Sequence, residues 1–308
     1  MNLPAEFISN IQNTFGEDGY AFLKALPESI AAASARWGLT NVEPVPTLSY
    51  NFVAFAERGD EQVILKMGVP NREFKSEMAA LRLFDGNGAC RLLEHEEEKH
   101  WMLLERLRPG EMLSTLDDDE EATHIAAQVM QNIWRPADGL LGQSPGSRTF
   151  IQLIDWFDGL KRLRASFQGG TGPFGEALVE RVEGSVKEFF AENHRPVLMH
   201  GDFHHFNILS SERGWLIIDP KGVTGPACYE VGPLLINPWN SLSVMKEYRS
   251  LTKRRIDILH ERLGFERERI REWGLAHAVL SAWWGMEDHT GWEYALGCAE
   301  MIAELPIK

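Results

Sequence analysis

Residues 200–207 read His-Gly-Asp-Phe-His-His-Phe-Asn, and their side chains indicate the chemistry of this chain most directly. Asp202 and Asn207 are five residues apart, which is the interval between the aspartate and the asparagine of a kinase catalytic loop. Asp219 ends the apolar run Leu216-Ile-Ile twelve residues later. Phosphoryl transfer needs a carboxylate that accepts the hydroxyl proton and hard oxygen ligands for the metal ion on the phosphates. The spacing therefore predicts Asp202 as the catalytic base and Asn207 and Asp219 as ligands of Mg²⁺.

Two other interpretations of this stretch are open. A polar turn before a buried strand, with histidines that only cap and pack, would explain an aspartate and an asparagine alone. A metal-dependent hydrolase is the second alternative, because three histidines and Asp202 lie within residues 200–205. Dinuclear hydrolases usually start from His-x-His on a strand, whereas this stretch starts with His-Gly-Asp. The full pattern favours the kinase.

A lysine and a glutamate earlier in the chain support the same chemistry. Lys66 ends Val63-Ile-Leu-Lys, which has the form of the kinase strand lysine that meets the nucleotide phosphates. Glu77 lies on the helix expected to follow, where it can hold this lysine in an ion pair. Glu73, one turn earlier on the same helix, is the alternative partner. The order of lysine, glutamate, aspartate, asparagine and aspartate is that of a kinase.

The glycine-rich phosphate loop of a kinase has no counterpart here. Where it should lie, the chain reads Leu48-Ser-Tyr-Asn-Phe-Val without glycine. Ser49 and the backbone amides around it are the candidate phosphate contacts. An ordinary turn would explain the segment equally well.

Hydrophobic spacing predicts two differently built halves that must position these residues. Residues 5–37 predict one or two amphipathic helices, and residues 52–67 predict a β-hairpin that leads into the helix with Glu77. Beyond Pro109, apolar residues recur at helical spacing, including an inward stripe over residues 275–283. We therefore expect a nucleotide-binding lobe with leading helices over residues 1–107, and a helical catalytic and substrate lobe over residues 108–308.

Composition excludes several classes of protein. The net charge of −14, from 45 acidic and 31 basic residues, repels nucleic acid and anionic membranes, so neither is expected as a partner. Solubility alone would also explain this charge. The three cysteines are scattered and lack the C-x-x-C spacing of a zinc knuckle. Since the N-terminus also lacks the pattern of a secretory signal, we expect a cytoplasmic protein.

With these motifs described, the sequence resembles the aminoglycoside phosphotransferase superfamily. Within it, the likeness is to the aminoglycoside and hydroxyurea resistance kinases, the streptomycin kinase-like branch. The resemblance spans about residues 45–305. It rests on residues 200–207 and on Val63-Ile-Leu-Lys-Met, Ser76-Glu-Met-Ala-Ala-Leu-Arg-Leu, Gly88-Ala-Cys-Arg-Leu-Leu, Leu103-Leu-Glu-Arg-Leu, Ile218-Asp-Pro-Lys-Gly and Tyr229-Glu-Val-Gly-Pro-Leu-Leu-Ile-Asn-Pro.

This resemblance implies an α+β, protein-kinase-like bilobal fold and a role in antibiotic resistance. The implied activity is ATP- and Mg²⁺-dependent phosphorylation of a hydroxyl group on a small, cationic molecule such as an aminoglycoside. Glu105 to Leu107 would form the hinge whose backbone holds adenine, and Lys66 would bind the phosphates with Glu77 as its partner. His204 occupies the place where many protein kinases carry lysine. A kinase of an unrelated metabolite and a nucleotide-binding pseudokinase remain alternatives.

A cationic acceptor needs carboxylates in its pocket. Glu287 and Asp288 follow Trp283-Trp284-Gly285, which places an acidic pair beside aromatic rings that can hold a cation. Glu230 is a further candidate, as is His204 beside the catalytic aspartate. A solvated helix end beside core tryptophans explains the same pattern. The sequence leaves the acceptor, its hydroxyl group and the oligomeric state open.

A protein substrate is disfavoured. Asp219 is followed by Pro-Lys-Gly where a protein kinase has Phe-Gly, and no Ala-Pro-Glu closes an activation segment. A peptide would therefore lack the platform on which it lies in protein kinases.

Overall fold

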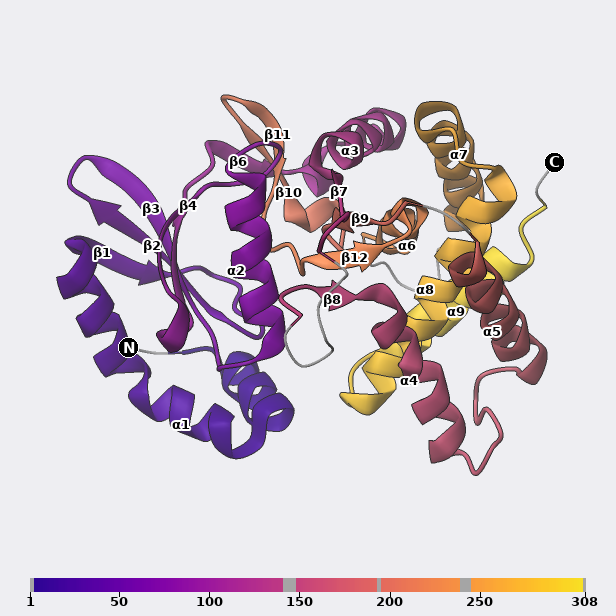
Figure 1. Cartoon of the computed structure of the whole chain (residues 1–308), viewed down its shortest axis with the longest axis horizontal. Coiled ribbons are helices and arrows are strands. Elements are labelled where there is room, and N and C mark those ends of the chain that lie inside the picture. Colours follow the sequence, from indigo (N-terminus) through magenta and orange to yellow (C-terminus); the bar gives the residue numbers. More distant parts are fainter. Residues whose placement is uncertain (1–2, 141–147, 193–194, 239–244, 307–308) are drawn as a thin grey trace.

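The computed structural model describes residues 3–140, 148–192, 195–238 and 245–306. Strands and helices both contribute to its architecture, as the α+β expectation required, and they divide into two parts (Figure 1). The first part is built on a five-stranded sheet from the N-terminal region. The second part is mostly helical and also contains two small sheets (Figure 1).

The five-stranded sheet is antiparallel throughout, with the strand order β1-β2-β3-β5-β4. The expected hairpin is confirmed, because β2 and β3 pair from Phe52 opposite Met67 to Arg58 opposite Glu61. The elements of this part are α1 (Ala5–Trp37), β1 (Leu39–Pro44), β2 (Phe52–Arg58), β3 (Glu61–Met67), α2 (Arg72–Phe84), β4 (Leu92–Glu96) and β5 (Trp101–Glu105).

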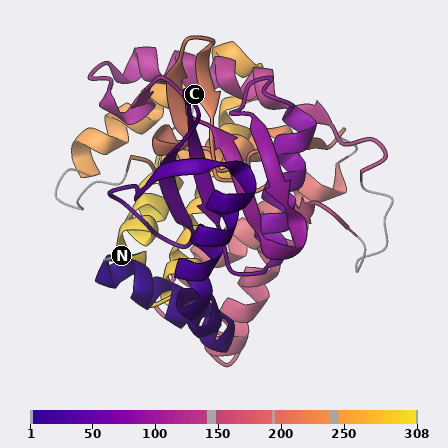
Figure 2. The same cartoon turned by 90° about the vertical axis from the view of Figure 1, so that its left-hand side faces the viewer.

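Helices cover both faces of this sheet, and α1 lies in front of it in Figure 2, in indigo. In β5, Trp101 and Leu103 pack in the cluster that contains α1, whereas Met102 and Leu104 pack in the cluster that contains α2. This alternation is the two-residue period of a strand. Because both faces are covered, β5 reads as a continuous apolar run.

The helix α1 is broken at Gly16, so the expectation of one or two helices resolves into two halves. Gly16 has φ 53° and ψ −129°, which is not a helical conformation. Phe7 and Ile11 of the first half and Leu26 of the second half are fully buried in one cluster with residues of the sheet. Apolar packing therefore fixes both halves to the sheet.

The helix α8 is the centre of the second part. Its Trp273 is fully buried, with ring centroids of Phe189 and Tyr229 at 4.7 and 5.6 Å. The inward stripe expected over residues 275–283 is confirmed by the burial of its apolar side chains. The elements of this part are β6 (Pro109–Met112), α3 (Asp119–Ile133), β7 (Arg135–Pro136), β8 (Ile151–Gln152), α4 (Leu153–Ser166), α5 (Glu176–Ala191), β9 (Val197–Met199), β10 (Ile208–Ser211), β11 (Gly214–Ile217), β12 (Val223–Gly225), α6 (Val231–Leu235), α7 (Met245–Leu263), α8 (Arg267–Glu287) and α9 (Trp292–Ala303).

Two small sheets hold the loops that carry the predicted chemistry. Their strand orders are β7-β9-β12-β8 and β11-β10-β6. Residues 200–207 connect β9 to β10, and residues 218–222 connect β11 to β12. Since β9 pairs with β12 and β10 pairs with β11, the two connections lie side by side.

Candidate active site

The loop that carries Asp202 has a tightly constrained backbone. Gly201 has φ 89°, and a Cβ atom there would lie 2.4 Å from Cγ2 of Val223, so only glycine fits before the aspartate. The Asp202 N–H donates to Nδ1 of His200 (3.1 Å), and Nε2 of that ring donates to the Ile218 carbonyl (2.9 Å). Burial lowers the pKa of His200 to about 4, which keeps the ring neutral for both contacts. His200 therefore ties the loop to the segment after β11.

Asn207 and Asp219 line the same cleft as Asp202. The Asn207 side-chain nitrogen donates to the Asp202 carbonyl (3.1 Å). The side-chain oxygen of Asn207 takes no part in this hydrogen bond. Asp219 has φ 55°, in the left-handed region that residues other than glycine rarely adopt, and its side chain is 34% exposed. The structure thus brings together the three oxygen-bearing side chains that the sequence assigned to one site.

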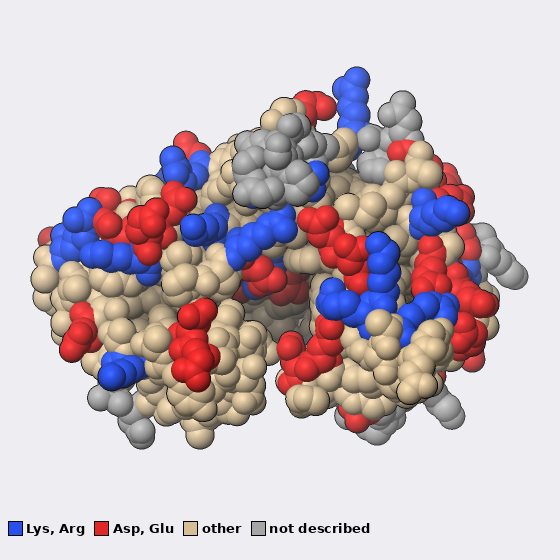
Figure 3. All heavy atoms as spheres, turned by 60° about the horizontal axis from the view of Figure 1, so that its bottom comes forward, with Lys and Arg blue, Asp and Glu red and all other residues tan. Residues whose placement is uncertain are grey.

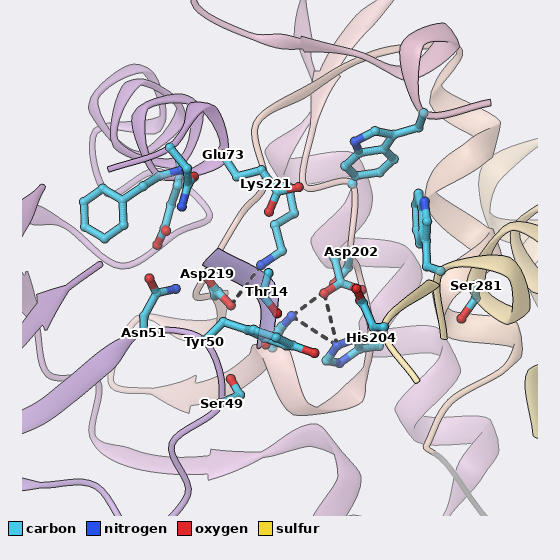
Figure 4. Close-up of a pocket in the computed structure, with 18 of the residues that line it drawn as sticks. Thr14, Ser49, Tyr50, Asn51, Glu73, Asp202, His204, Asp219, Lys221 and Ser281 are labelled. Atoms are coloured by element: carbon cyan, nitrogen blue, oxygen red, sulfur yellow. Dashed lines mark hydrogen bonds and ion pairs between the residues drawn. The ribbon is translucent and has the colours of Figure 1, made fainter. Parts of the chain in front are cut away.

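Histidine and lysine side chains set the charge of the two aspartates. Nε2 of His204 lies 3.6 Å from Oδ2 of Asp202, and Figure 4 shows these residues with Asp219 and Lys221 around one space. Burial alone would raise the pKa of Asp202, but His204 and then Lys221 hold it below its usual value. The same balance lowers the pKa of Asp219, because Lys221 and Lys66 outweigh the effect of burial. Both aspartates are therefore ionised at neutral pH.

Lys66 lies between two carboxylates in the interior. Its Nζ is 2.5 Å from Oε1 of Glu77 and 2.6 Å from Oδ1 of Asp219. Burial would lower the pKa of Lys66, but Asp219 and Glu77 outweigh this effect and raise the pKa above its ordinary value. The ammonium therefore stays charged. Ser76, next to Glu77, donates to the Gly222 carbonyl (2.8 Å) and so fastens α2 to the segment after Asp219. Of the two candidate partners, the structure places Glu77 on the lysine.

A cleft of about 870 Å³ opens between the two parts, and the hollow is visible in Figure 3 with acidic and basic side chains along its rim. Ser49 and Tyr50, from the loop between β1 and β2, line its first wall. Thr14 and Phe15, immediately before the break in α1, line its edge. Burial raises the pKa of the Tyr50 hydroxyl, and the charge of Asp288, which also lines the cleft, raises it further.

The opposite wall combines a carboxylate with aromatic rings. Trp156 of α4 and Trp284 of α8 meet edge to face, with ring centroids 5.3 Å apart at an interplanar angle of 84°. Both tryptophans and Asp288 line the cleft. Burial raises the pKa of Asp288, and the charge of Glu287 adds to this. Such a wall can hold a cation by charge and by its ring faces.

Comparison with known proteins shows the family to which this chain belongs. Residues 36–289 match the family described as aminoglycoside/hydroxyurea antibiotic resistance kinase. A hydroxyurea phosphotransferase from Kitasatospora aureofaciens is 31% identical over 298 residues, which cover 94% of this chain and 81% of that protein. The chain belongs to this family.

A second sequence relative and a solved structure are also similar to this chain. A streptomycin 6-kinase from Streptomyces griseus is 28% identical over 291 residues, 94% of this chain and 92% of that protein. A thermostable mutant of aminoglycoside phosphotransferase APH(4)-Ia, in a ternary complex with ADP and hygromycin B, matches with a TM-score of 0.59 at 14% identity, over 90% of this chain and 98% of that one. The expected protein-kinase-like bilobal fold is confirmed. The enzyme is a small-molecule kinase whose acceptor is a hydroxyl group, as the resemblance implied.

The predicted hinge of the kinase is already engaged in part. The Glu105 N–H donates to the Arg91 carbonyl (2.9 Å), and the Glu105 carboxylate accepts from the Arg91 N–H (2.9 Å) and pairs with Arg213. Glu105 therefore has no N–H left for adenine, and the donors that this segment still offers come from Arg106 and Leu107. The Leu107 side chain is buried, and neither Glu105 nor Leu107 lines the described cleft.

Glu230 corrects the prediction of a substrate contact. Its side chain is fully buried, and its two carboxylate oxygens accept from the N–H groups of His200 and Gly201, both at 2.8 Å. Burial raises the pKa of Glu230 to about 8, although the two N–H donors oppose this shift. The prediction was wrong because sequence alone did not show that the 3-10 turn at residues 227–230 packs beneath the catalytic loop. Glu230 fixes the backbone that presents Asp202.

Glu287 also differs from its prediction. Its carboxylate forms a two-pronged ion pair with Arg162 of α4 (2.7 and 2.9 Å), and it does not line the cleft. Only Asp288 of the predicted acidic pair lines the cleft. Trp283, likewise, is buried in the core beside Phe167, whereas Trp284 lines the cleft.

Lys221, Trp156 and Tyr50 are among the cleft residues that sequence reasoning missed. Lys221 lay within the Asp-Pro-Lys-Gly motif that carried the resemblance, so its position after Asp219 was an available signal. Trp156 lay in an amphipathic stretch that indicated packing alone. Tyr50 gave no signal beyond its place in the glycine-free loop.

The metal-dependent hydrolase and a membrane-spanning helix can each be compared with the structure. Within the described ranges, no group of three or more His, Cys, Asp or Glu side chains is arranged to hold a metal ion, and the comparisons do not favour the hydrolase. Among the helices of the same ranges, none combines the length and the apolar character needed to cross a bilayer.

Proposed function

We propose that this kinase transfers the γ-phosphoryl group of ATP, with Mg²⁺, to a hydroxyl group of an aminoglycoside of the streptomycin type. The observation that carries the proposal is that Asp202, Asn207 and Asp219 line the same cleft as Asp288, with the buried Lys66 ammonium held on Asp219. Streptomycin has guanidinium groups, which suit a cleft lined by a carboxylate and by aromatic rings. The relative solved with ADP and hygromycin B supports nucleotide use in this fold.

Asp202 is the proposed base. The acceptor hydroxyl oxygen attacks the γ-phosphorus, the bond from that phosphorus to the ADP oxygen breaks, and the hydroxyl proton passes to an Asp202 carboxylate oxygen. This needs an ionised carboxylate, and the lowered pKa of Asp202 provides it. His204, 3.6 Å away, is the proposed positioning residue for that carboxylate.

Asn207 and Asp219 are the proposed metal ligands. A carboxylate with one-third of its surface exposed and an amide oxygen turned away from its own loop are hard oxygen donors, which suit Mg²⁺. Bound there, the ion would neutralise charge on the nucleotide phosphates. Lys66 is the proposed phosphate contact held by Glu77, with Ser49 a further contact from the loop and the Glu105–Leu107 segment at adenine.

Asp288, with Trp156 and Trp284, is the proposed cation subsite for the acceptor. The cleft volume of about 870 Å³, at the upper end of ordinary ligand sites, suits a site that takes the nucleotide phosphates and an acceptor together. We further propose a cytoplasmic location, where a reducing environment suits the buried free thiols of the three cysteines. The lobe boundary near residue 107 is likewise proposed.

The test is product formation. Purified protein is incubated with ATP, Mg²⁺ and either streptomycin or hydroxyurea, and the acceptor is analysed by mass spectrometry alongside ADP release. We expect a singly phosphorylated streptomycin and ADP in equal amounts, with ADP release far slower when the acceptor is omitted. ADP release that ignores the acceptor, with no phosphorylated product, would overturn the proposal, and a product from hydroxyurea alone would reassign the acceptor.

A further inference from the structure

Lys221 is fixed in the cleft by its own backbone. It lies two residues after Asp219, and its N–H donates to the carbonyl of His200 (2.7 Å) at the start of the catalytic loop. The next residue, Gly222, accepts the hydrogen bond from Ser76 of α2 (2.8 Å). Lys221 therefore starts from a position that is tied to both the catalytic loop and the helix of Glu77.

The ammonium group of Lys221 faces the reacting end of the cleft. Its Nζ lies 3.4 Å from Oδ2 of Asp219, and the side chain, 25% exposed, lines the cleft (Figure 4). The ammonium thus pairs with the proposed metal-binding carboxylate and lines the same cleft as the proposed base, Asp202.

The two lysines on Asp219 have different surroundings. Lys66 is 6% exposed and is shared between Glu77 and Asp219, so its charge is already matched. Lys221 lies on the other carboxylate oxygen, at the longer distance of 3.4 Å, and lines the same cleft as Asp202. An acceptor hydroxyl at Asp202 and a phosphate on a metal ion held by Asp219 would meet between these two aspartates, beside Lys221. A cation there faces the charge that spreads over the transferring group.

The catalytic loop itself supplies no lysine. His204 stands where many protein kinases carry that residue, and its ring contacts Asp202 and the Asn207 side chain. A fixed cation for the transferring phosphoryl group must therefore come from another segment.

We propose that Lys221 is a catalytic residue that contacts the γ-phosphoryl group during its transfer. The inference rests on the proposed kinase reaction. The phosphorus gains the bond to the acceptor oxygen and loses the bond to ADP, the proton goes to Asp202, and the Lys221 ammonium keeps its protons while it pairs with a non-bridging phosphoryl oxygen.

The experiment compares Lys221→Met and Lys221→Arg with the wild type. Calorimetry with Mg²⁺ and either ADP or a non-hydrolysable ATP analogue measures binding without an acceptor, and steady-state kinetics with streptomycin measures turnover. For Lys221→Met we expect ADP affinity within threefold of wild type and a loss of about tenfold in the preference for the triphosphate, as for one charge-assisted hydrogen bond. We expect kcat to fall about 100-fold, as for removal of one preorganised donor. Lys221→Arg should restore part of both.

Lys161→Met is the matched control, because Lys161 forms a 2.7 Å ion pair with Asp158 while its side chain is 83% exposed. It should leave both quantities unchanged. An unchanged triphosphate preference in a folded Lys221→Met protein, or an equal loss of ADP and triphosphate affinity, would overturn the proposal. If the wild type phosphorylates no aminoglycoside, the proposed acceptor fails, yet the binding comparison still decides the role of Lys221.

Discussion

The two walls of the cleft are built in opposite ways. On the phosphate wall, Lys66, Glu77 and Asp219 are joined by contacts of 2.5 and 2.6 Å and are largely buried. On the acceptor wall, the Asp288 carboxylate has no ion-pair partner among the described residues, and it stands beside the open rings of Trp156 and Trp284. The phosphate wall is organised before any ligand arrives, whereas the acceptor wall leaves its charge to be matched by the ligand. Changes on the two walls should therefore separate in kinetics.

The largest effect is expected at the residue that both walls face. Asp202→Asn removes the proton acceptor with little change in size, so kcat should fall about 10²- to 10⁴-fold. ATP affinity should stay within threefold, because the Asp202 carboxylate pairs with His204 and not with a residue proposed to bind phosphate or metal. Kinetics and nucleotide titration measure the two quantities, with Asp158→Asn on the surface as the control. A variant with full turnover would contradict the assignment of the base.

On the phosphate wall, Glu77→Gln should cost both stability and nucleotide affinity. It breaks one side of a buried ion pair, for which a loss of up to about 3 kcal/mol in the free energy of unfolding is typical. The remaining contact to Asp219 should pull Lys66 toward the metal ligand and raise KM for ATP. Urea unfolding and ATP kinetics measure these changes. Glu73→Gln is the control from the same helix, and equal effects in both variants would contradict the pairing seen here.

On the acceptor wall, Asp288→Asn should raise the acceptor KM about tenfold, the equivalent of one charged contact. The KM for ATP should not change, because Asp288 lies across the cleft from the phosphate residues. Its neighbour provides the matched control, since Glu287→Gln removes a carboxylate that already pairs with Arg162. If both variants weaken acceptor binding equally, the wall is not defined by Asp288.

The smallest effect is a pH dependence beneath the catalytic loop. Because burial raises the pKa of Glu230 to about 8 in the folded protein, the folded state favours the protonated form. This contribution to stability is complete below the unfolded pKa of about 4.3 and is lost as the pH rises through 8. In Glu230→Gln, the melting temperature should therefore decline less between pH 5 and pH 8 than in wild type. A calorimetric scan over that range measures it, and parallel curves would contradict the assignment.

The same contrast explains what the sequence revealed. The residues of the phosphate wall follow strand ends and short loops, where spacing alone limits where a side chain can point, so Asp202, Asn207 and Asp219 converge as predicted. The acceptor wall joins Trp156 of α4 to Trp284 of α8, and no local pattern records which helices meet. Which of Glu287 and Asp288 faces the cleft depended on the position of Arg162, a residue from another helix.

The fold shows a similar limit. The β2–β3 hairpin was predictable because its two strands and the turn between them lie in one short stretch of sequence. The strands β7, β8 and β12 are two or three residues long, too short for any periodicity, and they form only through their partners. The helix α2 ends at Phe84, and its C-cap is Asp85 in a left-handed conformation (φ 47°) where glycine is the usual residue.

The break in α1 has a consequence for how this enzyme can diversify. Thr14 and Phe15 border the cleft, yet they precede the segment matched by the family, residues 36–289. They take no part in the hydrogen bonds that hold the catalytic loop. Substitutions in this part of α1 would change the shape of the cleft edge. The residues proposed to bind the metal and the phosphates would keep their positions.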